Sequence, residues 1–139
     1  MTKLMADALQ APKGCSMLDI GFGIGGAAFA FAETLDATVH GIDVGVQGYN
    51  IAKQELAKLN ESRAAAGLSP LKITFALEDC VQATFAPESF DVIYSRDTFV
   101  HLSAEDKAHV FANCFKWLKP GGKLCIADYS LCRNSNATG

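Results

Sequence analysis

The residues best suited to chemistry in this chain directly follow short apolar segments. The glycine-rich run DIGFGIGG at residues 19–26 comes after the apolar stretch CSML. Glycines let a backbone turn sharply and let a ligand approach closer than any Cβ would permit. Gly21, Gly23 and Gly26 also satisfy the Gly-x-Gly-x-x-Gly spacing of dinucleotide-binding turns. The run therefore predicts a strand, a tight turn and a helix that together bind a nucleotide-like ligand.

Asp19 separates two interpretations of this turn. In a dinucleotide-binding turn the position two before the first glycine lies in a buried strand, and a carboxylate there is costly without a cationic or hydrogen-bonding partner. The amino group of S-adenosylmethionine is such a partner, directly or through water. The spacing Asp-x-Gly-x-Gly-x-Gly, with Gly21, Gly23 and Gly25, thus favours S-adenosylmethionine as cofactor. A nicotinamide-binding Rossmann domain stays open as a distant alternative, as does a glycine turn without a ligand.

Further polar residues follow the next two predicted strands. Asp43 comes about 20 residues after the glycine turn, where a carboxylate accepts hydrogen bonds from both ribose hydroxyls; the alternative is a helix N-cap. Its neighbour Val44 belongs to the same predicted cofactor site. Asp79 suits the adenine amino group or, alternatively, an ordinary loop, and Cys80 lies beside it.

The elements that must position these residues alternate between strand and helix. We expect strands at 16–20, 38–42, 71–77, 90–94 and 123–127, and helices at 26–35, at 46–66 and after Ser103. The segment KPGG at 119–122 predicts a turn before the last strand. This order predicts an α/β fold, a Rossmann-like doubly wound parallel sheet, in one domain over residues 1–139. We expect a helix or lead-in at 1–15 and a frayed tail at 134–139.

Composition excludes several classes of function. The chain of 139 residues is 50% hydrophobic and 19% charged, as expected for a globular domain, and its net charge of −3 with no basic run argues against nucleic-acid binding. No apolar stretch of about 18 residues predicts a membrane span, and no secretory signal is apparent. Five scattered cysteines without a Cys-x-x-Cys pair indicate reduced thiols and a cytoplasmic location, and no metal site is predicted.

The second half of the chain adds three segments: IYSRDTFVHL at 93–102, CFKWLKPGG at 114–122 and IADY at 126–129. Together with the glycine turn they resemble class I S-adenosylmethionine-dependent methyltransferases, and most specifically the phosphoethanolamine N-methyltransferases. In that family the Ser-Arg-Asp-x-x-x-His-Leu segment carries the catalytic histidine. The resemblance therefore implies a small phosphorylated amino alcohol, such as phosphoethanolamine, as substrate.

The resemblance also implies roles for individual residues. His101 would be the general base that takes a proton from the substrate ammonium, because histidine titrates near neutral pH. Arg96 would contact the methyl donor and Asp97 the substrate, although the two could instead pair with each other. Tyr129 would contact the substrate phosphate. His40 and His109 lie within a predicted strand and a predicted helix, and we expect both to be structural.

The chain departs from the family pattern at both ends. Only some 15 residues precede the first strand, no tyrosine occurs before Tyr49, and the closing antiparallel strands and further phosphate-binding residues have no counterpart here. We therefore expect a truncated domain, poorly active alone, whose sheet edge invites self-association or a partner chain. The alternative is a non-catalytic S-adenosylmethionine-binding module or pseudoenzyme.

Overall fold

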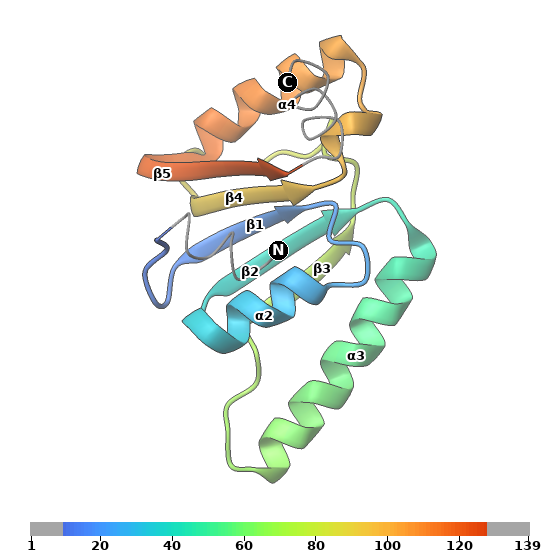
Figure 1. Cartoon of the computed structure of the whole chain (residues 1–139), viewed down its shortest axis with the longest axis vertical. Helices are drawn as coiled ribbons and strands as arrows, with labels where there is room; N and C mark the ends of the chain where they lie inside the picture. The colour runs from blue at the N-terminus through green and yellow to red at the C-terminus, as the bar shows by residue number, and fades with distance from the viewer. Residues whose placement is uncertain (1–9, 128–139) are drawn as a thin grey trace, which may run out of the picture.

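The computed structural model describes residues 10–127, and within them five strands form one parallel sheet (Figure 1). The strands are β1 (Ser16–Ile20), β2 (Thr38–Asp43), β3 (Ile73–Leu77), β4 (Phe90–Arg96) and β5 (Leu118–Ala127). Their order across the sheet is β3-β2-β1-β4-β5. The order in which strands are added therefore reverses at β1, with β2 and β3 on one side of it and β4 and β5 on the other. The predicted Rossmann-like fold is confirmed. The predicted tail and most of the predicted lead-in lie outside the described residues.

Helices cover both faces of this sheet. α2 (Gly26–Leu35) and α3 (Val46–Ala65) pack on one face, and α4 (Ala104–Trp117) packs on the other. The alternation along β1 explains this, because Met17 belongs to the buried cluster that includes Phe31 of α2, whereas its neighbour Leu18 belongs to the cluster that includes Val110 of α4. Asp19 follows Leu18 and so shares the α2 face with Met17.

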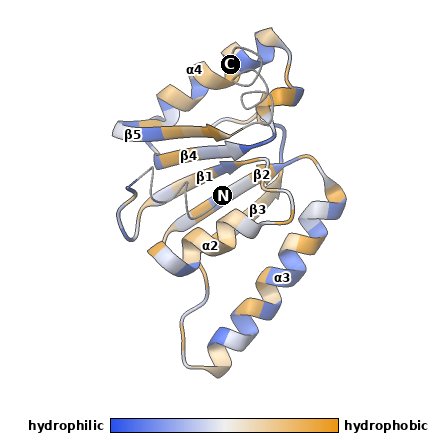
Figure 2. Cartoon of the chain, viewed as in Figure 1, coloured by the Kyte–Doolittle hydropathy of each residue, from blue (hydrophilic) through white to orange (hydrophobic). Residues whose placement is uncertain are grey.

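The helix boundaries follow the local signals in the sequence. The Ser103 side chain accepts a hydrogen bond from the backbone N–H of Asp106 at 3.1 Å, which confirms the predicted cap of α4. α3 ends at Ala65, close to the predicted boundary. Hydrophilic residues run along much of α3, which buries only Ala52 fully (Figure 2). α3 therefore covers the β2–β3 side of the sheet through a narrow apolar stripe.

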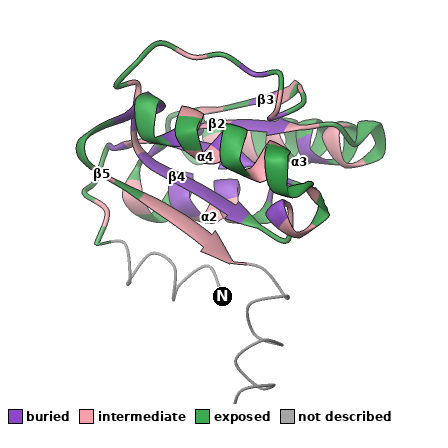
Figure 3. Ribbon diagram, turned by 90° about the horizontal axis from the view of Figure 1, so that it is seen from above, coloured by how far each residue is buried: buried purple, intermediate pink, exposed green. Residues whose placement is uncertain are grey.

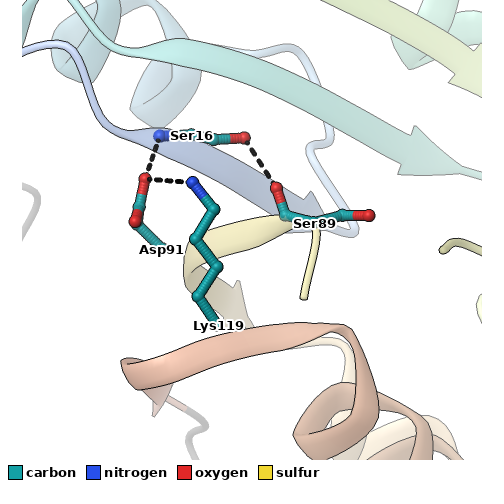
Figure 4. A network of polar contacts seen from close by, with 4 residues as sticks. All are labelled: Ser16, Ser89, Asp91 and Lys119. Carbon is teal, nitrogen blue, oxygen red and sulfur yellow. Dashed lines mark hydrogen bonds and ion pairs between the residues drawn. The ribbon is translucent and has the colours of Figure 1, made fainter. Parts of the chain in front are cut away.

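The segment at 119–122 differs from the sequence prediction. It belongs to β5, as an irregularity in the pairing with β4: Phe90 pairs with Leu118, and the next pair is Val92 with Lys123. A polar network fixes this end of the sheet (Figure 4). Asp91 Oδ2 accepts hydrogen bonds from the backbone N–H of Ser16 at 2.8 Å and from Lys119 Nζ at 3.4 Å. The extra residues thus bring the lysine back to β4, which a pattern of turn-forming residues could not reveal.

β5 is more exposed to solvent than its neighbour β4. β4 is buried along most of its length, whereas β5 is half-buried or exposed after Leu118 (Figure 3). Among residues 10–127, no helix is both long enough and apolar enough to cross a membrane.

Candidate functional site

Two adjoining cavities lie at the carboxyl edge of the sheet. The larger has a volume of about 520 Å³ and the smaller about 310 Å³. They share Gly21, Gly23, Arg96 and Asp97, so the glycine turn after β1 and the segment after β4 form their common wall. This is the position at which open parallel sheets bind ligands, outside the carboxyl ends of strands where the strand order reverses.

The structure brings most of the predicted site residues to these cavities. The larger cavity is lined by nine of them: Gly21, Gly23, Asp43, Val44, Asp79, Cys80, Arg96, Asp97 and His101. Asp19 lines the smaller cavity. Gly25 lines neither. Tyr129 lies outside the described residues, so its predicted phosphate contact stays a prediction.

Gly25 is explained by packing. It precedes α2 with a φ of 92°, and a Cβ at this position would lie 2.9 Å from Phe75 Cζ and 3.0 Å from Phe29 Cε2. The two phenylalanine rings lie edge to face with centroids 5.8 Å apart. Glycine is needed here because the helix must begin directly against this aromatic pair.

Asp43 joins the two loops beside the larger cavity. Its Oδ2 accepts a hydrogen bond from the Gly23 N–H at 2.8 Å, and its Oδ1 accepts one from the Gly45 N–H at 3.0 Å. The N-cap residue of α3 is Gly45, without a side-chain cap, so Asp43 does not fill the alternative role of helix N-cap. Its bond to Gly45 holds the loop before α3, and its bond to Gly23 fixes the glycine turn. Each oxygen retains a further lone pair, so the carboxylate can still accept bonds from a ligand in the cavity.

Asp79 and Cys80 form the far wall of the larger cavity. Asp79 Oδ1 accepts a hydrogen bond from the Val81 N–H at 2.9 Å, so the aspartate does stabilise its own loop. That bond uses one carboxylate oxygen, so the second oxygen can still accept a hydrogen bond from a ligand. Burial raises the pKa of the Cys80 thiol, which therefore contributes a neutral, apolar surface.

The segment after β4 is held against the glycine turn by hydroxyl groups. The Ile20 carbonyl accepts hydrogen bonds from Ser95 Oγ at 2.8 Å and from Thr98 Oγ1 at 3.3 Å. Between them, Asp97 adopts a φ of 56° and donates its N–H to the Ala127 carbonyl at 2.9 Å. A left-handed conformation is uncommon for a residue with a side chain and clusters at functional sites.

His101 ends a short 3₁₀ helix, η1 (Phe99–His101), and lines the larger cavity with Asp97. The side chain is exposed, and its backbone N–H bonds the Thr98 carbonyl at 3.1 Å. The other two histidines line neither of the two cavities. Burial lowers the pKa of His40, whose ring packs edge to face on Phe85 with centroids 5.7 Å apart. The Nε2 of the third, on α4, lies 3.1 Å from a backbone carbonyl.

Asp19 is the most perturbed acid of the site. It is almost fully buried, and burial raises the pKa of its carboxyl group to about 7. The Tyr94 hydroxyl partly offsets this rise, the carboxylate of Asp43 adds to it, and the guanidinium of Arg96 lowers it. Buried titratable groups of this kind in a cavity are typical of functional sites.

Sequence reasoning missed several residues that line the cavities, among them Thr98 and Tyr94. Both lie within the IYSRDTFVHL segment, and Tyr94 follows the apolar pair Val92 and Ile93 near the carboxyl end of its strand, which is the signal that could have found it. Within the part of the chain that the structure describes, no group of three or more His, Cys, Asp or Glu side chains could hold a metal ion.

Comparison with known proteins agrees with this geometry. A family model described as a methyltransferase domain matches residues 17–122. Phosphoethanolamine N-methyltransferase 1 of Triticum aestivum is 43% identical over 133 residues, which are 96% of this chain and 24% of the relative. The Plasmodium falciparum phosphoethanolamine N-methyltransferase is 36% identical over 97% of this chain and 47% of its own length.

A solved structure supports the same relationship. Phosphoethanolamine N-methyltransferase 2 of Haemonchus contortus, in complex with phosphomonomethylethanolamine and S-adenosylhomocysteine, matches with a TM-score of 0.80 at 28% identity, over 97% of this chain and 31% of that one. This chain spans about a quarter of the wheat relative and about half of the Plasmodium one. The predicted resemblance is confirmed, and the chain belongs to the methyltransferase domain family, close to the phosphoethanolamine N-methyltransferases.

Proposed function

We propose that this chain binds S-adenosylmethionine and directs its methyl group to the amine of a small phosphorylated amino alcohol such as phosphoethanolamine. The observation that carries the proposal is the junction of the two cavities. There the glycine turn borders both cavities, and Asp43 and His101, which come from two other strand ends, line the larger cavity with it. The names of the similar proteins support the choice of donor and substrate.

The described residues fit such a donor. The carboxylate of Asp43 has the free lone pairs to accept both ribose hydroxyls, and the second oxygen of Asp79 suits the adenine amino group. The buried carboxylate of Asp19 in the smaller cavity suits the donor's ammonium group. Val44 and Cys80 supply apolar surface for the base, and Arg96 stands between the two cavities.

The chemistry then depends on positioning and on one proton. When bound, the donor supplies an electrophilic methyl group on a sulfonium. An amine acts as a nucleophile only after it loses its proton, so His101 is assigned to accept that proton from the substrate ammonium. Asp97 would hold the ammonium beside His101, because both side chains border the larger cavity. Fixing both partners in one geometry is worth several powers of ten in rate.

Binding and methyl transfer test this function separately. Calorimetry with S-adenosylhomocysteine and with NAD distinguishes the two cofactor classes, and transfer of a labelled methyl group to phosphoethanolamine, ethanolamine and inorganic phosphate reports the acceptor. We expect S-adenosylhomocysteine to bind and phosphoethanolamine to be the labelled acceptor. Binding without transfer would favour the non-catalytic module, and binding of NAD alone would contradict the proposal.

We also propose that the outer edge of β5 associates with a second copy or a partner chain. β5 is the last strand of the described sheet on that side, and its residues after Leu118 are exposed or only half-buried. Unpaired strand edges favour association. Sedimentation velocity should show a species larger than a monomer, and a stable monomer at all concentrations would contradict this.

A further inference from the structure

We infer that Tyr94 is a positioning residue of the donor site: its buried hydroxyl favours the ionised form of Asp19, which is the form that can receive the donor's ammonium group. This inference rests on the proposed function and deepens it. It assigns a role in donor recognition to a side chain that does not belong to the glycine turn.

The sheet places the two side chains together. Asp19 on β1 and Tyr94 on β4 are direct partners in the parallel ladder, and both line the smaller cavity. The Tyr94 ring is buried and packs edge to face on Phe31, with ring centroids 4.9 Å apart. Its hydroxyl is the only buried side-chain polar atom in the described residues without a hydrogen-bond partner. The hydroxyl therefore makes no hydrogen bond among the described residues, and we assign the Asp19 carboxylate, which lines the same cavity, as its acceptor when Asp19 is ionised.

The pKa values of the two side chains determine which of them donates the hydrogen bond. Burial, followed by the nearby Asp19, raises the pKa of Tyr94 well above its ordinary value. The hydroxyl therefore stays protonated at neutral pH and can donate to the carboxylate. A hydrogen bond to the charged form of an acid lowers the pKa of that acid. Tyr94 thus opposes the effect of burial, which by itself would keep Asp19 neutral.

Every other group that faces Asp19 acts more weakly than burial and Tyr94. Asp43 at the end of β2 disfavours the ionised form, and Arg96 at the end of β4 favours it. α2 contributes the apolar Ala27 and Phe31 to this side of the sheet. The protonation of Asp19 is therefore governed mainly by its own burial and by the hydroxyl of its partner.

This arrangement predicts how donor binding depends on pH. A ligand that carries an ammonium group requires the ionised carboxylate, so its affinity should rise about tenfold per pH unit below the apparent pKa of Asp19 and level off above it. That midpoint is expected near pH 7, given the pKa of about 7 for the ligand-free protein. A nucleoside ligand without the amino-acid portion should show no such dependence.

The experiment compares two probes and three proteins. Dissociation constants of S-adenosylhomocysteine and of 5′-methylthioadenosine, which lacks the amino acid, are measured between about pH 5.5 and 8.5. Tyr94→Phe removes the hydroxyl and keeps the ring that packs on Phe31. Tyr49→Phe, a hydroxyl deletion on α3 outside both cavities, is the matched control.

We expect Tyr94→Phe to move the midpoint for S-adenosylhomocysteine upward by about one to two pH units, the size expected for a hydrogen bond to a charged group. At pH 7, where half of the wild-type Asp19 is ionised, this corresponds to an affinity about 5- to 50-fold weaker. Binding of 5′-methylthioadenosine and the Tyr49→Phe control should be unchanged. An equal loss for both probes would indicate general damage to the pocket and would overturn the inference.

Further outcomes also test the role of Tyr94. An unchanged midpoint in Tyr94→Phe, or a flat profile for S-adenosylhomocysteine in the wild type, would overturn the role of Tyr94 while leaving donor binding intact. If neither probe binds the wild type, the proposed function itself fails. If Tyr94→Phe does not fold, carbon NMR of wild-type Asp19 and Tyr94 replaces it. Their signals must then titrate with one shared midpoint, and an independent response of the two residues would refute the pairing.

Discussion

Replacing Gly21 with alanine should disrupt the contact on which the site is built. Gly21 has a φ of 80°, and a Cβ there would overlap the Thr98 hydroxyl and lie 2.9 Å from Thr98 Cβ. Gly23, two residues further along the same turn, has a φ of 61°, and a Cβ added there would have no atom within 4 Å. An alanine would therefore meet the same backbone strain at either position, but only at Gly21 would its Cβ collide with Thr98.

The structure sets the size of the difference. Left-handed backbone costs alanine about 1–2 kcal/mol at either glycine. Gly21→Ala must also displace Thr98, which adds about 1–3 kcal/mol for overpacking. It further weakens the single hydrogen bond that the Thr98 hydroxyl donates, shared between the Ile20 and Arg96 carbonyls and worth about 1 kcal/mol. We expect a loss of about 3–6 kcal/mol for Gly21→Ala and about 1–2 kcal/mol for Gly23→Ala.

Urea denaturation of both variants measures this difference directly, provided that the slope of the transition is unchanged. A double-mutant cycle with Thr98→Ala tests the cause, because removal of the hydroxyl should recover about 1–2 kcal/mol in the Gly21→Ala background. Equal destabilisation of Gly21→Ala and Gly23→Ala, or a coupling energy of zero, would refute the contact between the glycine turn and the segment after β4.

Three further predictions concern the acidic and basic residues of the site. Asp43→Ala should weaken S-adenosylhomocysteine binding by about 1.5–3 kcal/mol in calorimetry, whereas the exposed α2 variant Glu33→Ala should not; equal affinities would remove Asp43 from the site. If the chain transfers methyl groups, His101→Ala should lower the single-turnover rate by about 10²–10⁴-fold with little effect on donor binding, and His109→Ala should retain the rate. Asp19→Asn should stabilise the ligand-free protein. The folded-state pKa of about 7 exceeds the unfolded value of about 3.9, so ionisation lowers the free energy of unfolding as pH rises from about 4 to 7. Urea titrations should therefore show a gain near zero at pH 4 and of at most about 4 kcal/mol at pH 8, and a gain independent of pH would contradict it.

Local patterns in the sequence were sufficient for the order of the elements. The apolar stretch before the glycine run, the acids after the strands and the Ser103 cap are signals carried by neighbouring residues, and the structure reproduces the elements they predict. The parallel sheet follows from the alternation of strands and helices, because such connections place successive strands side by side in the same direction. Nine predicted site residues line the larger cavity for the same reason, since the carboxyl ends of parallel strands meet at one edge.

Contacts between distant segments could not be obtained in this way. Gly25 fits the glycine spacing, yet it lines neither cavity and packs against two aromatic rings. The segment at 119–122 has the composition of a turn, yet its pairing with β4 draws it into β5. In both cases the residue type is compatible with more than one role. Contact with a distant element of the fold decides which role the residue has.

The sequence by itself determined the family of folds, the glycine turn and the acids at the strand ends, because each depends on residues close together in the chain. Only the tertiary structure decided which side chains face each other across the sheet. The register of β1 against β4 places Tyr94 beside Asp19, and the packing of the next segment places Thr98 over Gly21. Such register is fixed by the summed burial of two whole faces, so no local pattern specifies it.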